Sequence, residues 1–193
     1  MRSDAVLVVG PHVVVARPTA DDRDELLDAV AASRALHGEW VTAPDTAAAY
    51  GTFLARCGGP TFEGHLLRRR EDGALIGVAN VSEIVRGALQ SAFVGYYGLV
   101  GGTGRGHLTE GVGLVAGRAL GALGLHRIEA NVQPANEPSR ALLRRLGFRR
   151  EGYSPRYLHL AGAWRDHERW ALLADEPAAT ELVRRAAPPN HAR

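Results

Sequence analysis

Six consecutive residues, Gly101-Gly102-Thr103-Gly104-Arg105-Gly106, have the composition of an anion-binding turn. They follow an apolar stretch that predicts a strand, and they precede residues 107–123, whose pattern predicts a helix. Glycine tolerates positive φ and lets a ligand approach the main chain closely. The first N–H groups of a helix have no partner within it, and the helix dipole adds about half a positive charge there. The sequence therefore predicts a phosphate or pyrophosphate site at this turn.

Two well-known kinds of glycine-loop site, the P-loop and the Rossmann site, do not fit the rest of the sequence. A mononucleotide P-loop needs a lysine after its glycines, and all 23 basic residues of this chain are arginine. A Rossmann site needs G-x-G-x-x-G in a parallel βαβ unit and an acid at the end of the next strand. Here the spacing is Gly102-x-Gly104-x-Gly106, the preceding strands resemble an antiparallel meander, and Glu129 lies inside the next strand. On the glycines alone, a turn that binds no ligand stays the alternative.

The composition is typical of a globular protein. The chain has 193 residues, 46% of them apolar, so we expect one domain over residues 1–193, with a core over about 12–173 and a C-terminal tail over 174–193. The net charge of +2 is too small to indicate nucleic-acid binding. No apolar run approaches a membrane span and no signal peptide is evident, which predicts a cytoplasmic protein with no membrane partner. The single cysteine, Cys57, excludes an internal disulfide and a multi-cysteine zinc site.

The order of the predicted elements indicates a layered α+β domain. It runs strand, two helices, three antiparallel strands, helix, strand, helix and two strands, which predicts a mixed, mostly antiparallel sheet flanked by helices. The loop between the first two helices carries Trp40. The predicted helices cover residues 19–36, 45–56, 107–123 and 139–146, and the predicted strands cover residues 12–17, 64–70, 74–84, 92–97, 126–132, 157–160 and 164–173.

A series of short motifs surrounds the glycine run in a specific order. Each is weak alone, but their order and spacing are specific. They are Gly77-Val78-Ala79-Asn80 with Ser82 and Val85-Arg86-Gly87, Gly95-Tyr96, Gly104-Arg105-Gly106 with Thr109-Glu110, His126-Arg127-Ile128 with Ala130-Asn131, Pro134-Ala135-Asn136 with Ser139, Arg145-Leu146-Gly147-Phe148, Glu151-Gly152-Tyr153, and Trp164-Arg165-Asp166-His167. Over residues 12–173 the chain therefore resembles the GNAT superfamily of acyl-CoA N-acyltransferases, in particular the RimJ/RimL type, which acetylates protein N-termini such as those of ribosomal proteins.

This resemblance implies a GNAT fold, in which splayed strands form the acetyl-CoA cleft, and a direct attack of an amine on the thioester. It assigns Gly101 to Gly106 to the pyrophosphate, with Arg105 as a charged partner. Gly101 stands where the family commonly has Gln or Arg, so side-chain help is lost there. The donor to the oxyanion would be a main-chain N–H among Tyr97, Gly98 and Leu99, where the strand splays. No metal is implied.

The departing thiolate calls for an acid. Many GNAT enzymes carry a tyrosine in the short helix after the asparagine, and its place here is taken by Leu143. The RimJ/RimL type instead has a serine three residues after that asparagine, so Ser139 is the predicted acid. Asn136 and Ser139 share one helix face and would both approach the pantetheine arm. The alternative is that Asn136 caps the helix and Ser139 is an ordinary helix-start residue.

The acceptor amine must lose a proton, because an α-amino group has a pKa of ~8. Glu83, near the end of a strand beside the cofactor strand, is the predicted base, and a solvated strand-end acid is the alternative reading of it. Other candidates near the acceptor side are Tyr153, Tyr157, His159 and His167.

The resemblance also predicts the acceptor and its site. Trp40, Tyr50 and Arg86 are predicted walls of the acceptor groove, with core filler as the alternative for Trp40. The favoured acceptor is a protein or peptide N-terminus. A small amine such as an antibiotic or polyamine, and a non-catalytic acyl-CoA-binding protein, are the alternatives; acidic residues in the cleft would favour a cationic small molecule. The last hairpin could pair across a homodimer.

Overall fold

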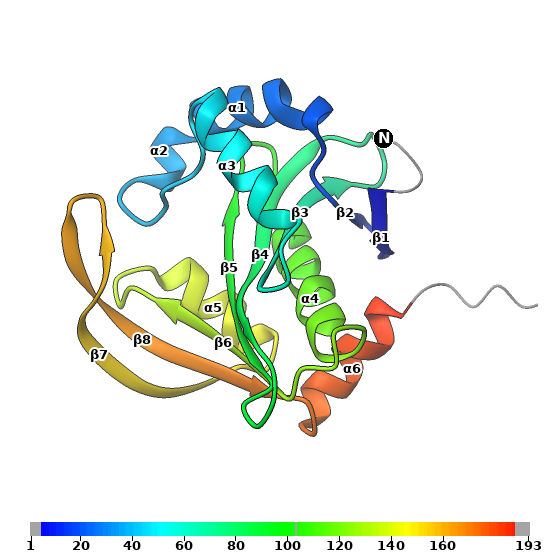
Figure 1. Cartoon of the computed structure of the whole chain (residues 1–193), viewed down its shortest axis with the longest axis vertical. Coiled ribbons are helices and arrows are strands. Elements are labelled where there is room, and N and C mark those ends of the chain that lie inside the picture. The colour runs from blue at the N-terminus through cyan, green and yellow to red at the C-terminus, as the bar shows by residue number, and fades with distance from the viewer. Residues whose placement is uncertain (1–4, 103, 188–193) are drawn as a thin grey trace, which may run out of the picture.

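An eight-stranded sheet forms the centre of the structure, a computed structural model that describes residues 5–102 and 104–187 (Figure 1). The strand order is β1-β2-β3-β4-β5-β6-β8-β7. All neighbouring pairs are antiparallel except β5 and β6, so the predicted mixed, mostly antiparallel sheet is confirmed. The strands are β1 (Val6–Val9), β2 (Val13–Ala16), β3 (Phe62–Arg69), β4 (Leu75–Val85), β5 (Ser91–Gly98), β6 (Arg127–Val132), β7 (Arg149–Leu160) and β8 (Ala163–Leu173).

Helices cover both faces of this sheet. Residues of α4 and α6 belong to the larger apolar cluster, and residues of α1 and α3 to a smaller cluster on the opposite face. Figure 1 shows α1, α2 and α3 together at one end of the molecule and α4 crossing the sheet beside α6. The helices are α1 (Arg23–Ala32), α2 (Arg34–His37), α3 (Ala47–Cys57), α4 (His107–Leu120), α5 (Glu137–Arg145) and α6 (Pro177–Ala186).

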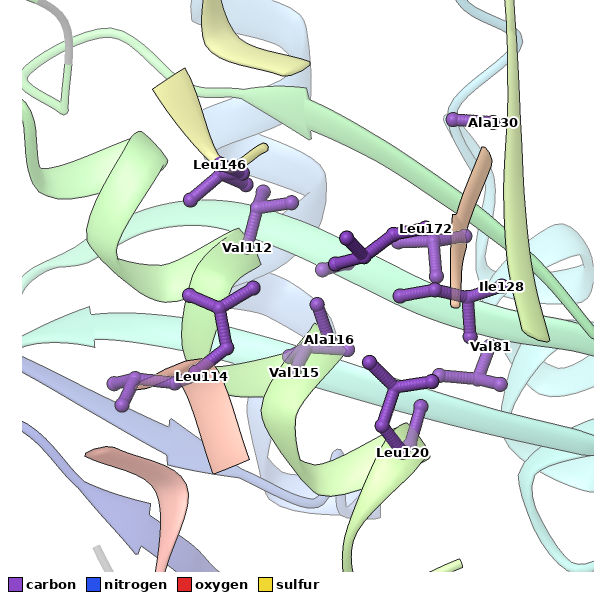
Figure 2. Packing of buried hydrophobic residues seen from close by; sticks show 14 of the residues in the cluster. Val81, Val112, Leu114, Val115, Ala116, Leu120, Ile128, Ala130, Leu146 and Leu172 are labelled. Carbon is purple, nitrogen blue, oxygen red and sulfur yellow. The ribbon is translucent and has the colours of Figure 1, made fainter. Parts of the chain in front are cut away.

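The larger cluster fixes α4 on the sheet. In Figure 2, Val112, Ala116 and Leu120 of α4 lie toward Ile128 of β6 and Leu172 of β8. All five side chains are nearly inaccessible to solvent. Full burial of a large aliphatic side chain contributes about 1.5–3 kcal/mol. The helix, and the glycine turn that precedes it, are therefore held firmly against the strands.

The two parallel strands at the centre of the sheet separate along their length. The register of β5 and β6 covers only Ser91 to Phe93 and Arg127 to Glu129. β5 then continues to Gly98 and β6 to Val132 without pairing to each other. The predicted splay is therefore present, and it opens toward the end of β5 that leads into the glycine run.

Three elements differ from the sequence expectations. The first predicted helix breaks at Ser33, whose hydroxyl donates to Ala29 O and accepts from the Val100 N–H, so α2 turns toward the end of β5. Strand β1 was not predicted. β7 begins at Arg149, whereas the sequence predicted a strand from Tyr157. The first half was missed because this edge strand is exposed on both faces and shows no alternation of apolar residues.

A charged cluster of Glu63 and His65 on β3 with Arg118 on α4 predicts that the stability of the fold depends on pH. Burial alone would raise the pKa of Glu63, but hydrogen bonds from His65 and Arg118 outweigh it and lower the pKa to about 2. Because the folded pKa lies below the ordinary value of 4.5, this contribution is complete above pH 4.5 and is lost as the pH falls toward 2. We expect Glu63→Gln to cost about 2–3 kcal/mol at pH 7 and much less at pH 3. Urea unfolding of both proteins at the two pH values measures this; an equal difference at both would contradict it.

Candidate active site

The glycine run forms the turn between β5 and α4. Gly101, Gly104 and Gly106 have φ of 92°, 85° and 78°, values that residues with a side chain rarely adopt. Gly102 has no room for a side chain, because a Cβ there would lie 2.3 Å from the backbone oxygen of Ile76. Gly106 immediately precedes the first turn of α4, so the unpaired N–H groups of that turn lie at the loop. Arg105 is exposed beside it, and Thr103 lies outside the described residues.

A large cleft of about 1330 Å³ opens beside this turn. Its walls come from the glycine turn, the first two turns of α4, α5 and the end of α6. Four arginines line it: Arg70, Arg145, Arg184 and Arg185. Arg184 and Arg185 pair with Glu181, whereas no ion pair joins Arg70 or Arg145 to any carboxylate of residues 5–102 and 104–187. The cleft can therefore hold a large ligand with several negative charges.

Glu110, on the first turn of α4, has a structural role. Both oxygens of the Glu110 carboxylate are engaged by the start of β2: Oε1 accepts from the N–H groups of His12 and Val13, and Oε2 lies 2.9 Å from His12 Nδ1. This side chain ties α4 to the sheet edge, and it forms part of the cleft wall.

A second, smaller cavity of about 110 Å³ lies at the opening between β5 and β6. It brings together residues from distant parts of the chain, including four that the sequence indicated: Trp40, Asn136, Ser139 and His167. The other residues that line it are Val41, Val94, Gly95, Tyr96, Ala130, Asn131, Val132, Gln133, Leu158 and Leu160.

Two hydroxyl groups meet at this cavity. The Tyr96 hydroxyl lies 2.8 Å from Ser139 Oγ, so one of the two donates to the other. Burial raises the pKa of Tyr96, which keeps its hydroxyl protonated at neutral pH. Asn136 is the cap of α5, because its side-chain oxygen accepts from the Ser139 N–H at 3.2 Å. The cap therefore fixes the start of the helix that presents Ser139.

Sequence reasoning missed Tyr96 as a site residue. It belongs to a motif that was identified, Gly95-Tyr96, but only the tertiary structure brings β5 and α5 together. The signal that could have found it was the absence of a tyrosine at Leu143, which calls for another hydroxyl near Ser139.

The main-chain N–H groups at the end of β5 were predicted to include the donor to the oxyanion, and the structure narrows the three candidates to one. Leu99 N–H donates to Ile76 O at 2.9 Å, so it is already used within the β4–β5 ladder. Because N–H directions alternate along a strand, Tyr97 N–H also points to β4, and Gly98 N–H points into the gap. The Gly98 carbonyl on the same side accepts from His37 Nε2 at 2.9 Å. Of the three predicted donors, only Gly98 faces the opening.

Three further predictions were placed wrongly. Tyr50 is 2% exposed, and its hydroxyl donates to Thr19 O at 2.5 Å inside the smaller core, so it forms no acceptor wall. Arg86 donates to Leu123 O at 2.6 Å in the β4–β5 hairpin. Glu83 is exposed near the same hairpin, four residues along β4 from Ala79, the partner of Tyr96, which is roughly 13 Å. An antiparallel hairpin places both residues at the closed end of the splay, opposite the glycine turn.

The loop that carries Trp40 crosses the small cavity. The Glu39 carbonyl accepts from Nε2 of Gln133, the residue after β6, at 3.5 Å, and the Glu39 carboxylate forms an ion pair with Arg165 of β8. These contacts hold Trp40 over the opening, where it is half-buried, and it is not core filler.

The other candidate bases lie on the β7–β8 hairpin. Tyr153 is exposed, and its hydroxyl donates to the Asp166 carboxylate. The rings of His159 and Trp164 meet edge-on, as do the rings of Tyr157 and His167. Of the four, only His167 lines the small cavity.

In residues 5–102 and 104–187, no three His, Cys, Asp or Glu side chains are grouped as a metal site. No helix in the same ranges is both long and apolar enough to cross a bilayer.

Comparison with known proteins gives consistent matches. A family model described as the acetyltransferase (GNAT) domain matches residues 12–149. The probable N-acetyltransferase YjcK of Bacillus subtilis (strain 168) is 43% identical over 102 residues, 53% of this chain and 56% of that protein. The ribosomal protein uS5-alanine N-acetyltransferase of Escherichia coli (strain K12) is 39% identical over 102 residues, 53% of each chain. The chain therefore matches about half the length of these two curated relatives.

The solved structures extend the likeness to most of the chain. Mycobacterium smegmatis RimJ in complex with CoA-disulfide superposes with a TM-score of 0.77 and 28% identity, over 89% of this chain and 88% of that one. The fold of this chain is therefore represented among solved acetyltransferase structures.

Proposed function

The chain belongs to the GNAT acetyltransferase family, and we propose that it transfers the acetyl group of acetyl-CoA to the N-terminal α-amino group of a protein or peptide. The observation that carries this proposal is the Tyr96–Ser139 hydroxyl pair, which lies where the large cleft and the small cavity share α5. A donor in the cleft and an acceptor in the cavity would meet there. The printed name of the E. coli relative, a ribosomal-protein alanine acetyltransferase, supports the class of acceptor.

The large cleft fits CoA by its size and charge. A Cβ at Gly102 would enter the space between the turn and β4, so only glycine lets the main chain lie as it does. The N–H groups at the start of α4 can bind a pyrophosphate, and Arg70 and Arg145 are available for further phosphate charge. CoA supplies a reactive thioester when it is bound.

The chain's own groups can assist the transfer at three points. Gly98 N–H faces the gap and can donate to the oxyanion that forms from the thioester carbonyl. The hydroxyl pair can donate a hydrogen bond to the departing sulfur and so stabilise its negative charge. Because the ordinary pKa of a thiol, about 8.5, lies below that of a hydroxyl, the sulfur can leave as a hydrogen-bonded thiolate and take its proton from water.

The cavity lining favours a peptide over a polyamine. None of the described residues that line the small cavity is acidic; its polar groups are amides, hydroxyls and one histidine. A polycationic amine would find no carboxylate to pair with there. The volume of about 110 Å³ corresponds to roughly four water molecules, which suits a small first residue such as alanine or serine.

We expect peptides that begin with Ala or Ser to be acetylated at least tenfold faster than peptides that begin with Leu or Phe, and faster than spermidine. The reason is the small cavity beneath Trp40. Initial rates with a matched peptide series that differs only in its first residue measure this. Faster acetylation of spermidine or an aminoglycoside than of every peptide would favour the small-amine alternative.

We further propose that residues 1–193 act as one domain in the cytoplasm, where acetyl-CoA and newly made proteins are available. β7 is an exposed edge strand, so the last hairpin offers a surface for homodimer pairing. Sedimentation of the purified protein tests the dimer.

A further inference from the structure

We infer that His167 is the general base of the transfer, taking at Nε2 the proton that the acceptor nitrogen releases, and that Asn131 orients that nitrogen. This inference rests on the proposed function and identifies the base that Glu83 does not supply.

The His167 ring has a defined tautomer. Its Nδ1 lies 3.0 Å from the Arg165 carbonyl oxygen, and because a carbonyl can only accept, Nδ1 carries the proton. The neutral ring then has a lone pair on Nε2, and no hydrogen bond from the described residues reaches that atom. Burial lowers the pKa of His167, outweighing the Arg165 carbonyl and Asp166, so the ring is neutral at physiological pH.

The ring is also fixed in place. His167 is 1% exposed, and the Tyr157 ring meets it edge-on with centroids 6.2 Å apart. Three charged neighbours of His167 along β8 are engaged elsewhere. Asp166 accepts from the Arg156 N–H and the Tyr153 hydroxyl, and Arg165 pairs with Glu39. Glu168, the next residue along β8, binds Arg140, Arg150 and Trp170 Nε1.

Asn131 supplies a second acceptor to the same cavity. Its Oδ1 is buried and has no hydrogen-bond partner in the described structure. A buried carbonyl without a donor costs roughly 1–3 kcal/mol, which an incoming N–H would recover. Asn131 and His167 come from the paired strands β6 and β8, on the sheet face opposite to the cluster that contains Ala130 and Val132.

The hydroxyl donors and the nitrogen and oxygen acceptors lie on opposite faces of the sheet at the gap between β5 and β6. Tyr96 packs against the larger cluster on one face and contacts Ser139, while Asn131 and His167 lie on the other face. In the transfer, the neutral amine nitrogen forms the new bond to the acetyl carbon while the carbon–sulfur bond breaks. One amine proton passes to His167 Nε2, and the departing thiolate accepts a hydrogen bond from the hydroxyl pair. The imidazolium then releases its proton to water, and the thiolate takes one proton from water, so that every group of the protein returns to its starting state.

We expect His167→Gln to lower kcat for an Ala-first peptide about 100-fold at pH 7, with the CoA dissociation constant unchanged within twofold. The residual kcat/KM of the variant should follow the α-amine titration alone, whereas the wild-type kcat/KM should fall more steeply at acid pH, where His167 also becomes protonated. His126→Gln, which alters an exposed histidine at the closed end of the splay, is the matched control and should behave like wild type. Asn131→Ala should instead raise the peptide KM about tenfold.

A His167→Gln protein with wild-type kcat and the wild-type pH profile would overturn the inference while leaving the proposed function intact. Wild-type protein that binds CoA but acetylates no amine would overturn both. If the Gln variant does not fold, the test passes to His167→Asn, and to the wild-type profile alone if that variant also fails. A wild-type kcat/KM that follows only the α-amine titration, with no second group, would then contradict a histidine base.

Discussion

Replacing Gly102 by alanine is expected to weaken CoA binding about 100-fold and to reduce acetyl transfer in proportion. The new Cβ would lie 2.3 Å from Ile76 O and 2.7 Å from Ile76 Cβ. That oxygen already accepts from Leu99 N–H, so β4 cannot easily move and the glycine turn must shift instead. A displacement of about 1 Å in a positioning loop can cost 100-fold. Isothermal titration with CoA measures the loss.

Gly73→Ala is the matched control for this variant. Gly73 lies in the β3–β4 turn with φ of 75° and nothing within 4 Å of a Cβ, so it tests backbone strain alone. We expect it to lower the unfolding free energy by about 1–2 kcal/mol and to leave CoA affinity unchanged. A Gly102→Ala protein that binds CoA as tightly as Gly73→Ala would remove the glycine turn from the cofactor site.

Removing either hydroxyl of the Tyr96–Ser139 pair is expected to lower kcat about 100-fold, while CoA affinity changes less than threefold. Tyr96→Phe keeps the half-buried ring packed against the larger cluster, and Ser139→Ala keeps the N–H that Asn136 caps. Neither change should therefore disturb the fold. Steady-state kinetics and CoA titration of both variants separate the rate from binding.

The double variant tests whether the two hydroxyls act together. Because Tyr96 and Ser139 share one hydrogen bond, the loss in the double variant should be close to that in either single variant. Losses that multiply would mean that the two groups act independently. Losses of CoA affinity as large as those of kcat would assign the pair to binding instead.

Local features of the site were predictable from the sequence. The strand, the glycine turn and the following helix are contiguous, and glycine at positive φ has a strong local signature, so residues 101–106 were identified as a turn before α4. The cap at Asn136 and the position of Ser139 also follow from local spacing. Trp40 was assigned to the acceptor groove by the resemblance, from its position in the family's first loop.

The remaining residues depend on sheet geometry that spacing does not reveal. Glu83 and Arg86 precede β5 by only a few residues, but the antiparallel hairpin carries them to the end of the sheet away from the opening. Tyr50 has the helical spacing of a core residue, and its ring is buried in the core, so it is not available to line the acceptor groove. Tyr96 and His167 meet the cavity only because β5 and β6 separate after Phe93, a register that the sequence does not specify.

The most direct measurement is the mass change of a peptide with an alanine N-terminus and one internal lysine, incubated with the protein and acetyl-CoA. The account predicts one acetyl group, located on the α-amine by fragmentation, and no reaction when that amine is blocked beforehand. Acetylation of the lysine in the blocked peptide, or no acetylation of either amine by protein that binds CoA in the titration, would contradict N-terminal acetyl transfer as the function of this chain.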